Sequence, residues 1–401
     1  MRFMVFTLSL LISGTLYSQS QPKSPEAILE EGMVLQENGK YADAIVLLNQ
    51  CIYLYPTQAE AYALRAACKE QLHELSRALT DYTISLELLP NQYEVLLKRG
   101  ALLFRLELYE KSRQDFLKLL SLPTGETTSV FYRKSAHSEG TDKIMTAQGF
   151  LKPQVYNYLG LIETQLNHCN NGIVYADSAI ALNPIEADYY VNRALAKQVC
   201  QDKTFKADFD KALELNPEHP IALHNLALLE GKDGSYEQAE KRLTEAINSD
   251  STLSYSYSER GYYRFQRSDY RGAITDYDQA LKLNNTNPEV WLNRGIAKER
   301  LTDFKGAYAD YTQAIELQED FTKAWLNRGN LFTKQGQYQK AIEDYTAAIT
   351  FHPQYAAAYY NRAVAFHQLK LVKESCKDLT QAEKLGFKVD PKMKAIFCQG
   401  L

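Results

Sequence analysis

Apolar residues recur at helical spacing through most of this chain, and the pattern itself repeats. The stretch "WLNRG" begins at Trp291 and again at Trp325, 34 residues later, and each copy runs into a helical pattern of apolar positions. A period contains an aromatic, a small residue and a Tyr or Leu, then an alanine, an aromatic and an alanine, and many periods close on a helix-stopping proline. Each period therefore predicts two helices joined by a short turn.

The period extends along nearly the whole chain in ten units. Nine units span about 34 residues, and the unit from Ala187 is one residue shorter. Two helices of this length bury too little apolar surface on their own, so neighbouring units must stack into one continuous core. The units start near Pro25, Ala59, Tyr93, Pro153, Ala187, Pro220, Ser254, Pro288, Thr322 and Ala356.

The pattern breaks once and changes at the C-terminal end. Residues 124–152 lack the period and are rich in Ser, Thr and Gly. They are interpreted as a flexible excursion or, alternatively, as a loop that folds over a groove or a partner and is anchored by "SVFY". Asp390 followed by Pro391 is typical of a helix start. Residues 390–401 are therefore predicted to form a helix that caps the last unit.

The first residues differ from the rest. Arg2 precedes the apolar run "FMVFTLSLLISGTLY" and the polar "SQSQ", which is typical of a signal peptide over residues 1–18, cleaved near Ser18 or Ser20. A membrane anchor fits less well, because the run is shorter than the roughly 20 apolar residues that a span needs. We expect an exported protein without membrane insertion, either periplasmic or secreted.

The repeated pattern resembles the tetratricopeptide repeat (TPR) family over residues 25–389, apart from the insertion. The resemblance implies an all-α fold, a right-handed superhelical solenoid of about ten helix pairs with a C-terminal capping helix. Residues 25–123 would hold units 1–3 and residues 153–389 units 4–10. The resemblance also implies that first helices line a concave groove in which peptides bind, as in secreted or periplasmic TPR scaffold proteins of bacteria.

Seven units share an arginine in the first helix, where the family usually has leucine, and an aspartate in the second helix. The units from Pro25, Pro153 and Pro220 lack the combination. An unpaired buried charge is costly and the arginine fork suits a carboxylate, so each pair is predicted to join the two helices of its unit. A row of arginines lining an anion-binding groove is the alternative. The pairs are Arg65–Asp81, Arg99–Asp115, Arg193–Asp208, Arg260–Asp276, Arg294–Asp310, Arg328–Asp344 and Arg362–Asp378.

The six cysteines form no C-x-x-C pair and have no zinc-finger histidines near them. Export permits disulfides, and a Cys376–Cys398 bridge is favoured because it would join the last repeat to its capping helix. Pairing of Cys51 with Cys68 and of Cys169 with Cys200 stays open, against free buried thiols. No nucleophile elbow, phosphate loop or metal motif is present, so we expect no catalysis, cofactor or metal. A net charge of −4 gives no reason to expect nucleic acid.

What remains is a surface for a protein or peptide partner, in the groove of the C-terminal units. Amides there can read an extended backbone, tyrosines can add apolar area, and lysines favour an acidic or C-terminal segment. Lys323, Asn327 and Asn361 match two of the three parts of a clamp with which some family members hold a C-terminal carboxylate, so the clamp is incomplete and we do not expect it to act as one. The alternative is a sensor module, or an accessory subunit that docks an enzyme, with residues 124–152 as the binding element. The candidate residues are Tyr262, Asn293, Lys323, Asn327, Asn330, Lys334, Tyr360 and Asn361.

Overall fold

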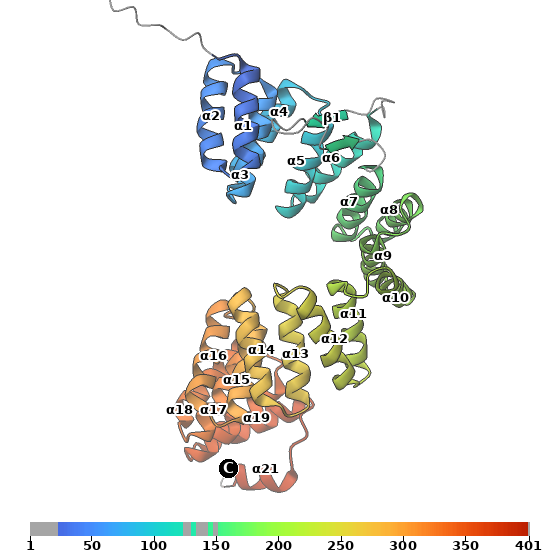
Figure 1. The fold of residues 1–401 in the computed structure, drawn as a ribbon. Helices are drawn as coiled ribbons and strands as arrows, with labels where there is room; N and C mark the ends of the chain where they lie inside the picture. Colours follow the sequence, from blue (N-terminus) through green and yellow to red (C-terminus); the bar gives the residue numbers. More distant parts are fainter. Residues whose placement is uncertain (1–22, 123–129, 134–142, 147–150, 400–401) are drawn as a thin grey trace, which may run out of the picture. The chain divides into compact units, whose positions relative to one another are not determined.

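The computed structural model describes residues 23–122, 130–133, 143–146 and 151–399, which are almost entirely helical (Figure 1). Ten helix pairs follow one another, and nine of the first helices begin at the residue where the sequence pattern starts a unit. The first helices are α1 (Pro25–Glu37), α3 (Ala59–Gln71), α5 (Tyr93–Arg105), α7 (Leu151–Gln165), α9 (Ala187–Val199), α11 (Pro220–Lys232), α13 (Ser254–Gln266), α15 (Pro288–Arg300), α17 (Thr322–Lys334) and α19 (Ala356–Gln368). The second helices are α2 (Tyr41–Leu54), α4 (Leu75–Leu88), α6 (Tyr109–Ser121), α8 (Cys169–Leu182), α10 (Phe205–Leu215), α12 (Tyr236–Ser249), α14 (Tyr270–Leu283), α16 (Phe304–Leu317), α18 (Tyr338–Phe351) and α20 (Val372–Lys384).

Local chemistry sets where these helices begin and end. In α15, the Asn287 side chain accepts a hydrogen bond from the Glu289 N–H, and Pro288 occupies the first turn, where its missing N–H is harmless. The helix ends at Arg300, and in the turn that follows Thr302 is left-handed, with a φ of 63°. Asp303 then caps α16 by accepting from the Gly306 N–H. The turn between the two helices is therefore only a few residues long, which forces the helices to pack antiparallel.

Small residues let the two helices of a unit approach closely, and large residues fill the space between them. Ala273, Ala307 and Ala341 on the second helices are completely buried. Tyr311 is also fully buried and lies against Gly295, where an added Cβ would come within 2.6 Å of the Tyr311 ring. The core is thus a column of aliphatic and tyrosine side chains between helices, as a stacked repeat requires.

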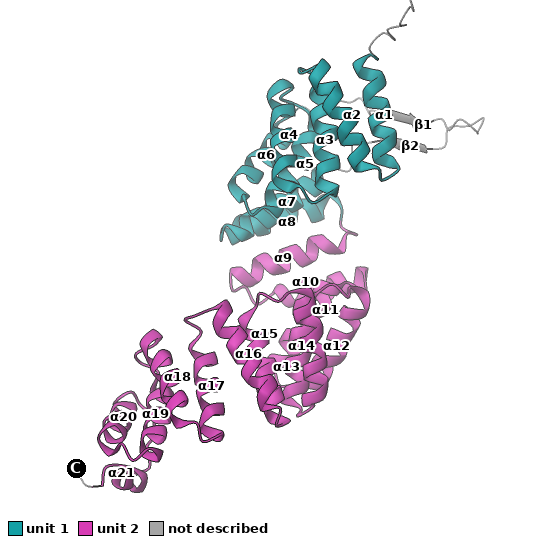
Figure 2. Ribbon diagram, turned by 90° about the vertical axis from the view of Figure 1, so that its left-hand side faces the viewer, with its two compact units in different colours: residues 1–183 teal, residues 184–401 magenta. Residues whose placement is uncertain are grey.

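The chain divides into two compact units, residues 1–183 and 184–401 (Figure 2). In the second unit each helix contacts the next, and the first helices of neighbouring repeats also touch, as α13 does α15, α15 does α17 and α17 does α19. The short helix α21 (Pro391–Phe397) packs on α20. A row of first helices therefore forms one face of this unit.

The insertion contains regular structure that its sequence does not indicate. Strands β1 (Val130–Arg133) and β2 (Lys143–Thr146) pair antiparallel, with Val130 opposite Thr146. Helix α7 begins at Leu151, so the last two residues of the range 124–152 belong to the next repeat. The short strands lack a repeat of apolar positions long enough to reveal them. The remainder of that range and the signal peptide expected over residues 1–18 lie outside the described residues.

No described helix is both long and apolar enough to span a bilayer.

Candidate interaction site

The structure brings all seven predicted Arg–Asp pairs together. In α15 and α16, Arg294 donates from Nε to Asp310 Oδ2 at 2.9 Å and from Nη2 to Oδ1 at 2.7 Å. The same pair of bonds recurs in every one of the seven units. The aspartates are nearly inaccessible and the arginines mostly buried, so each guanidinium faces one carboxylate in a fork geometry.

The arginines make two further contacts that the sequence reasoning missed. Arg294 Nη1 reaches Asp278 on the second helix of the preceding repeat at 2.6 Å, and its guanidinium lies 4.7 Å from the Trp291 ring. Arg328 likewise contacts Thr312 and lies 4.9 Å from the Trp325 ring. The contact with the aromatic ring could have been found in the sequence, because an aromatic residue stands three residues before six of the seven arginines, one helical turn away.

These contacts explain the recurring "WLNRG" and remove the arginines from the list of ligand groups. In at least six of the seven units the guanidinium also bonds a side chain of the preceding repeat, so it joins the two repeats and spends its donors within the protein. The alternative of a row of arginines that lines an anion-binding groove therefore finds no support, because the carboxylates already neutralise them.

Two of the units without the predicted pair contain a different ion pair. In α11 and α12 the polarity is reversed, with Arg242 on the second helix donating to Glu230 on the first at 2.7 Å. In α7 the fully buried Glu163 accepts from Arg113 of the preceding α6 at 2.6 Å and contacts His168 at 3.0 Å. Charge pairing between helices is therefore more widespread than the Arg–Asp pattern alone indicates.

A cavity of about 570 Å³ lies among the first helices α15, α17 and α19, and we name it the α17–α19 cavity. It brings together five of the eight predicted binding residues. It also contains residues from α15, α18 and α21 that the sequence reasoning did not include. The lining residues are Ile296, Glu299, Arg300, Asn327, Asn330, Thr333, Lys334, Tyr345, Tyr360, Asn361, Val364 and Met393.

The asparagines of this cavity are held in a polar network. Asn330 Oδ1 accepts from Asn361 Nδ2 and from the Tyr345 hydroxyl, both at 2.8 Å. Asn327 donates from Nδ2 to the Lys323 carbonyl at 2.7 Å. These bonds fix the orientation of the amides, and the Oδ1 atoms of Asn327 and Asn361 have no hydrogen-bond partner among the described residues. A ligand N–H can therefore be accepted there.

Three of the predicted binding residues have other roles. Lys323 is exposed outside the cavity and contributes only the carbonyl that holds Asn327. Lys334 lines the cavity but forms an ion pair with Glu299, which neutralises the charge expected to attract an acidic segment. Tyr360 stacks on Phe387 at 4.4 Å between ring centres, and its hydroxyl donates to Met393 Sδ at 3.3 Å. The sequence argument placed these side chains by repeat position alone, and it did not include residues of the predicted capping helix in the binding site.

The other two predicted residues, Tyr262 and Asn293, line a second cavity of about 450 Å³, the α13–α15 cavity. Its walls also contain Glu259 and Glu289. Burial, and then the neighbouring Glu289, raises the pKa of the Glu259 carboxyl. This cavity is acidic, which is opposite to the preference for acidic segments expected from the lysines.

The cysteines follow the prediction at the C-terminal end, and Cys51 and Cys68 follow the alternative of free buried thiols. Cys376 and Cys398 form a disulfide with their Cα atoms 4.9 Å apart. Cys51 and Cys68, considered as a pair, are free buried thiols, and burial raises the pKa of Cys68 to about 11. They act as small apolar side chains in the core of the first repeats. Cys169 and Cys200 lie in different compact units, and their pairing stays a prediction.

Groups of three or more His, Cys, Asp or Glu side chains placed to hold a metal ion are absent from the part of the chain that the structure describes.

Comparisons with known proteins agree with the architecture. Family models described as "TPR repeat" match residues 261–301 and 329–370, and models described as "Tetratricopeptide repeat" match 26–57, 209–241, 288–321 and 310–343. Among curated proteins, human Tetratricopeptide repeat protein 16 is 26% identical over 269 residues, and human Mitochondrial import receptor subunit TOM34 is 23% identical over 282. The matches cover 64% and 66% of this chain, and 28% and 84% of those relatives.

A rice DnaJ protein, P58IPK homolog B, is 23% identical over 68% of this chain and 66% of its own length. The chain thus spans less than two thirds of two of these relatives. Among solved structures, YrrB, described as a TPR protein with an unusual peptide-binding site, is 24% identical with a TM-score of 0.41, over 48% of this chain and 98% of its own. Yeast Tom70 is 17% identical with a TM-score of 0.39, over 93% and 94%.

The ten consecutive helix pairs, the 34-residue period that generates them and the family models that match in both compact units lead to one conclusion: the chain belongs to the tetratricopeptide repeat proteins.

Proposed function

We propose that this TPR protein is an exported scaffold that binds an extended segment of a partner protein in the α17–α19 cavity. TPR proteins mediate contacts between proteins, so a partner protein or peptide is the class of ligand that the family supports. The choice of this cavity and of export goes beyond the family and rests on the residues described above.

The observation that carries the proposal is the pair of fixed asparagine amides in the cavity. Asn327 and Asn361 stand on neighbouring first helices, and each spends one N–H on a contact within the protein. Because the amides are already held in place, their oxygens can accept hydrogen bonds from a ligand without a further loss of side-chain freedom on binding, which favours affinity. Two acceptors on adjacent helices suit the N–H groups of an extended peptide, because consecutive backbone N–H groups recur along it at regular spacing.

The remaining walls favour a segment without strong net charge. Lys334 and Glu299 neutralise each other. Ile296, Val364 and Met393 supply apolar surface to a ligand side chain. We infer that the segment combines an exposed backbone with at least one apolar side chain, in place of the acidic segment expected from the lysines alone.

Export is supported by two features of different kinds. Residues 1–18 have the pattern of a signal peptide, and the Cys376–Cys398 disulfide is of the kind that persists outside the reducing cytosol. Sequencing the N-terminus of the protein recovered from the envelope and the medium tests this part. A mature start near residue 19 or 21 supports it, and an intact Met1 in a cytosolic fraction contradicts it.

The binding site is tested with peptides selected from a random dodecapeptide display library on the immobilised full chain. The double variant Asn327→Ala with Asn361→Ala is expected to bind the selected peptide at least tenfold more weakly than the parent chain, a loss of about 1.4 kcal/mol in binding free energy. Asn225→Ala is the matched control, because Asn225 occupies the same repeat position as Asn327 and makes the same bond to its own helix, from Nδ2 to the Ile221 carbonyl at 2.8 Å. This control is expected to leave affinity unchanged.

The insertion gives the competing site for the same experiment. If the double variant binds the selected peptide as tightly as the parent chain while deletion of residues 124–152 abolishes binding, the cavity proposal is wrong. The insertion is then the binding element, as the sensor or accessory-subunit alternative requires. Recovery of no peptide from the library also counts against the proposal.

A further inference from the structure

The short helix α21 is more than a cap, because one of its side chains enters the proposed binding cavity. Met393 on α21 lines the α17–α19 cavity beside Tyr360, Asn361 and Val364 of α19. The Tyr360 hydroxyl donates to Met393 Sδ, so the tyrosine and the methionine form one wall. This end of the cavity is therefore closed by a side chain of the short helix α21.

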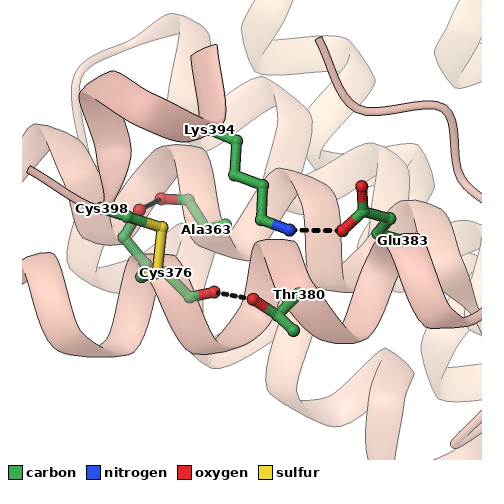
Figure 3. The surroundings of a disulfide bond; sticks show 7 residues. Ala363, Cys376, Thr380, Glu383, Lys394 and Cys398 are labelled. Carbon is green, nitrogen blue, oxygen red and sulfur yellow. Dashed lines mark hydrogen bonds and ion pairs between the residues drawn. A yellow bond between two sulfur atoms is a disulfide. The ribbon is translucent and has the colours of Figure 1, made fainter. Parts of the chain in front are cut away.

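Besides the disulfide, α21 is held by one small apolar cluster, in which Phe397 and Met393 pack with residues of α19 and α20. The helix has seven residues, well below the roughly 12–15 that an isolated helix needs in water. Within α21 only Phe397 is buried, and Ile396 is 58% exposed. Outside the apolar contacts, Lys394 forms an ion pair with Glu383 on α20 at 2.5 Å, which is partly exposed and therefore weak (Figure 3).

The buried contact of α21 carries a cost of its own. The Phe397 ring stacks on His367 of α19 with ring centres 3.8 Å apart. This leaves His367 Nδ1 buried without a hydrogen-bond partner in the described part of the chain. A buried polar atom without a partner opposes docking, so the stacking offsets only part of what the helix needs.

The Cys376–Cys398 disulfide supplies the missing constraint. It joins Cys376, near the start of α20, to Cys398, which directly follows α21, and Figure 3 shows Cys398 directly beside Cys376 while Lys394 points to Glu383. The bond closes a loop of 22 residues, which restricts the undocked states of the segment.

We propose that α21 is a wall of the peptide site, that Met393 contacts the bound segment, and that the Cys376–Cys398 disulfide keeps this wall in position. Met393 is an unbranched, polarizable side chain that adapts to different apolar partners. It therefore selects for an apolar ligand side chain without demanding one shape. This inference rests on the proposed function for its ligand, but the docking of α21 by the disulfide does not.

The docking is tested by hydrogen exchange of the full chain, without any ligand. The variant Cys376→Ser with Cys398→Ser removes only this bond. Amides of α21, such as those of Lys394 and Cys398, which donate to the Asp390 and Lys394 carbonyls, are expected to exchange at least 30-fold faster. Amides of α17 should not change. Equal protection of α21 in the variant and the parent overturns the role of the disulfide.

The wall is tested with the selected peptide. The cysteine double variant and Met393→Ala, which keeps the disulfide, are each expected to weaken binding at least fivefold. Ile396→Ala is the matched control on the same helix, because that side chain points to solvent. If Met393→Ala, or a cysteine variant whose α21 is released, binds the peptide as tightly as the parent chain, the proposal that α21 is a wall of the site is wrong. If no peptide is selected, the proposed function fails while the exchange experiment still decides how α21 is held.

Discussion

The repeat formed by α15 and α16 and the repeat formed by α11 and α12 share one backbone plan and differ in three features: an ion pair, a packing contact and the turn between their helices. The first has Arg294 facing Asp310, Gly295 facing Tyr311, and Thr302 in the turn. The second places Arg242 on the opposite helix, has Ala227 near Leu243, and turns at Gly234. The fold therefore tolerates two solutions to the same helix contact.

The two ion pairs differ in burial and geometry. The Asp310 side chain is 3% exposed and both of its oxygens accept from Arg294, with Lys298 a further 2.9 Å neighbour. The Glu230 side chain is 26% exposed, one oxygen receives both bonds from Arg242, and Oε2 has no partner among the described residues. Burial also raises the pKa of Asp344 in a related pair, although Arg328 lies beside it. Desolvation is thus large where the pair is buried. The Arg242–Glu230 pair is more exposed and loses less hydration, although Glu230 Oε2 is itself buried.

The largest expected effect comes from removing one carboxylate in each repeat. Asp310→Ala should lower the free energy of unfolding of its repeat by about 3–5 kcal/mol, because Lys298 and two donors of the mostly buried Arg294 lose their carboxylate and only the more exposed Asp278 still pairs with Arg294. Glu230→Ala should cost about 1 kcal/mol or less, as partly exposed pairs do. Hydrogen exchange of the α15–α16 and α11–α12 amides in the full chain measures both. Equal losses would mean that burial does not separate the two pairs.

The next effect concerns pH and belongs to the α11–α12 repeat alone. His224 on α11 is buried, its Nδ1 lies 3.1 Å from the Ser256 hydroxyl, and burial lowers its pKa to about 4. The unfolded chain takes up a proton near pH 6.5 and the folded chain only near pH 4, so stability falls as the pH is lowered across this window.

The total loss from His224 is about 3 kcal/mol between pH 6.5 and 4. Glu and Asp residues titrate toward the lower end, so the measured quantity is the difference between the parent chain and His224→Gln. That difference should shrink as the pH falls and the parent loses its advantage. A difference that stays constant with pH would show that His224 takes up its proton as readily in the folded chain as in the unfolded chain.

A third effect tests the packing beside the arginine. Gly295→Ala should destabilise the α15–α16 repeat by about 1–3 kcal/mol, because the new Cβ would lie 2.6 Å from Tyr311 in a filled core. Adding Tyr311→Leu recreates the combination of Ala227 and Leu243. The double variant should be at least about 1 kcal/mol more stable than the sum of the single changes predicts, as contacting residues are. Additive losses in denaturation would contradict the idea that these positions are coupled.

The sequence contained the repeat plan and the Arg–Asp pairs because both depend on periodic positions. A pair that recurs 16 residues apart in repeat after repeat is a contact that alignment of the chain with itself can find, as for Arg294 and Asp310. Contacts that occur once leave no such trace. The reversed Arg242–Glu230 pair and the packing of Tyr360 under Phe387 and Met393 belong to that second kind.

The binding residues also show what the repeat period can predict and what it cannot. Asn327, Asn330 and Asn361 could be placed on one face from their repeat positions, and they do line one cavity. Whether a lysine there is free or neutralised depends on a side chain one repeat away, as with Lys334 and Glu299. The helical period says which face a residue is on, while charge pairing depends on the conformations of long side chains.

The smallest expected effect sharpens the comparison at the turn. Thr302 adopts a φ of 63° and Gly234 a φ of 80°, both in the left-handed region. That conformation costs an ordinary residue about 1–2 kcal/mol, and a branched Cβ fits it poorly, whereas glycine loses about 0.5–1 kcal/mol of chain entropy. Thr302→Gly should therefore stabilise the α15–α16 repeat by about 1 kcal/mol, since the Thr302 side chain is exposed and its hydroxyl donates to the adjacent Leu301 carbonyl of the same repeat. Gly234→Thr should destabilise the α11–α12 repeat by a similar amount, and local hydrogen exchange reads both. A loss of stability in Thr302→Gly would show that the rigidity threonine gives the turn outweighs its strain, and that the two turns are not equivalent.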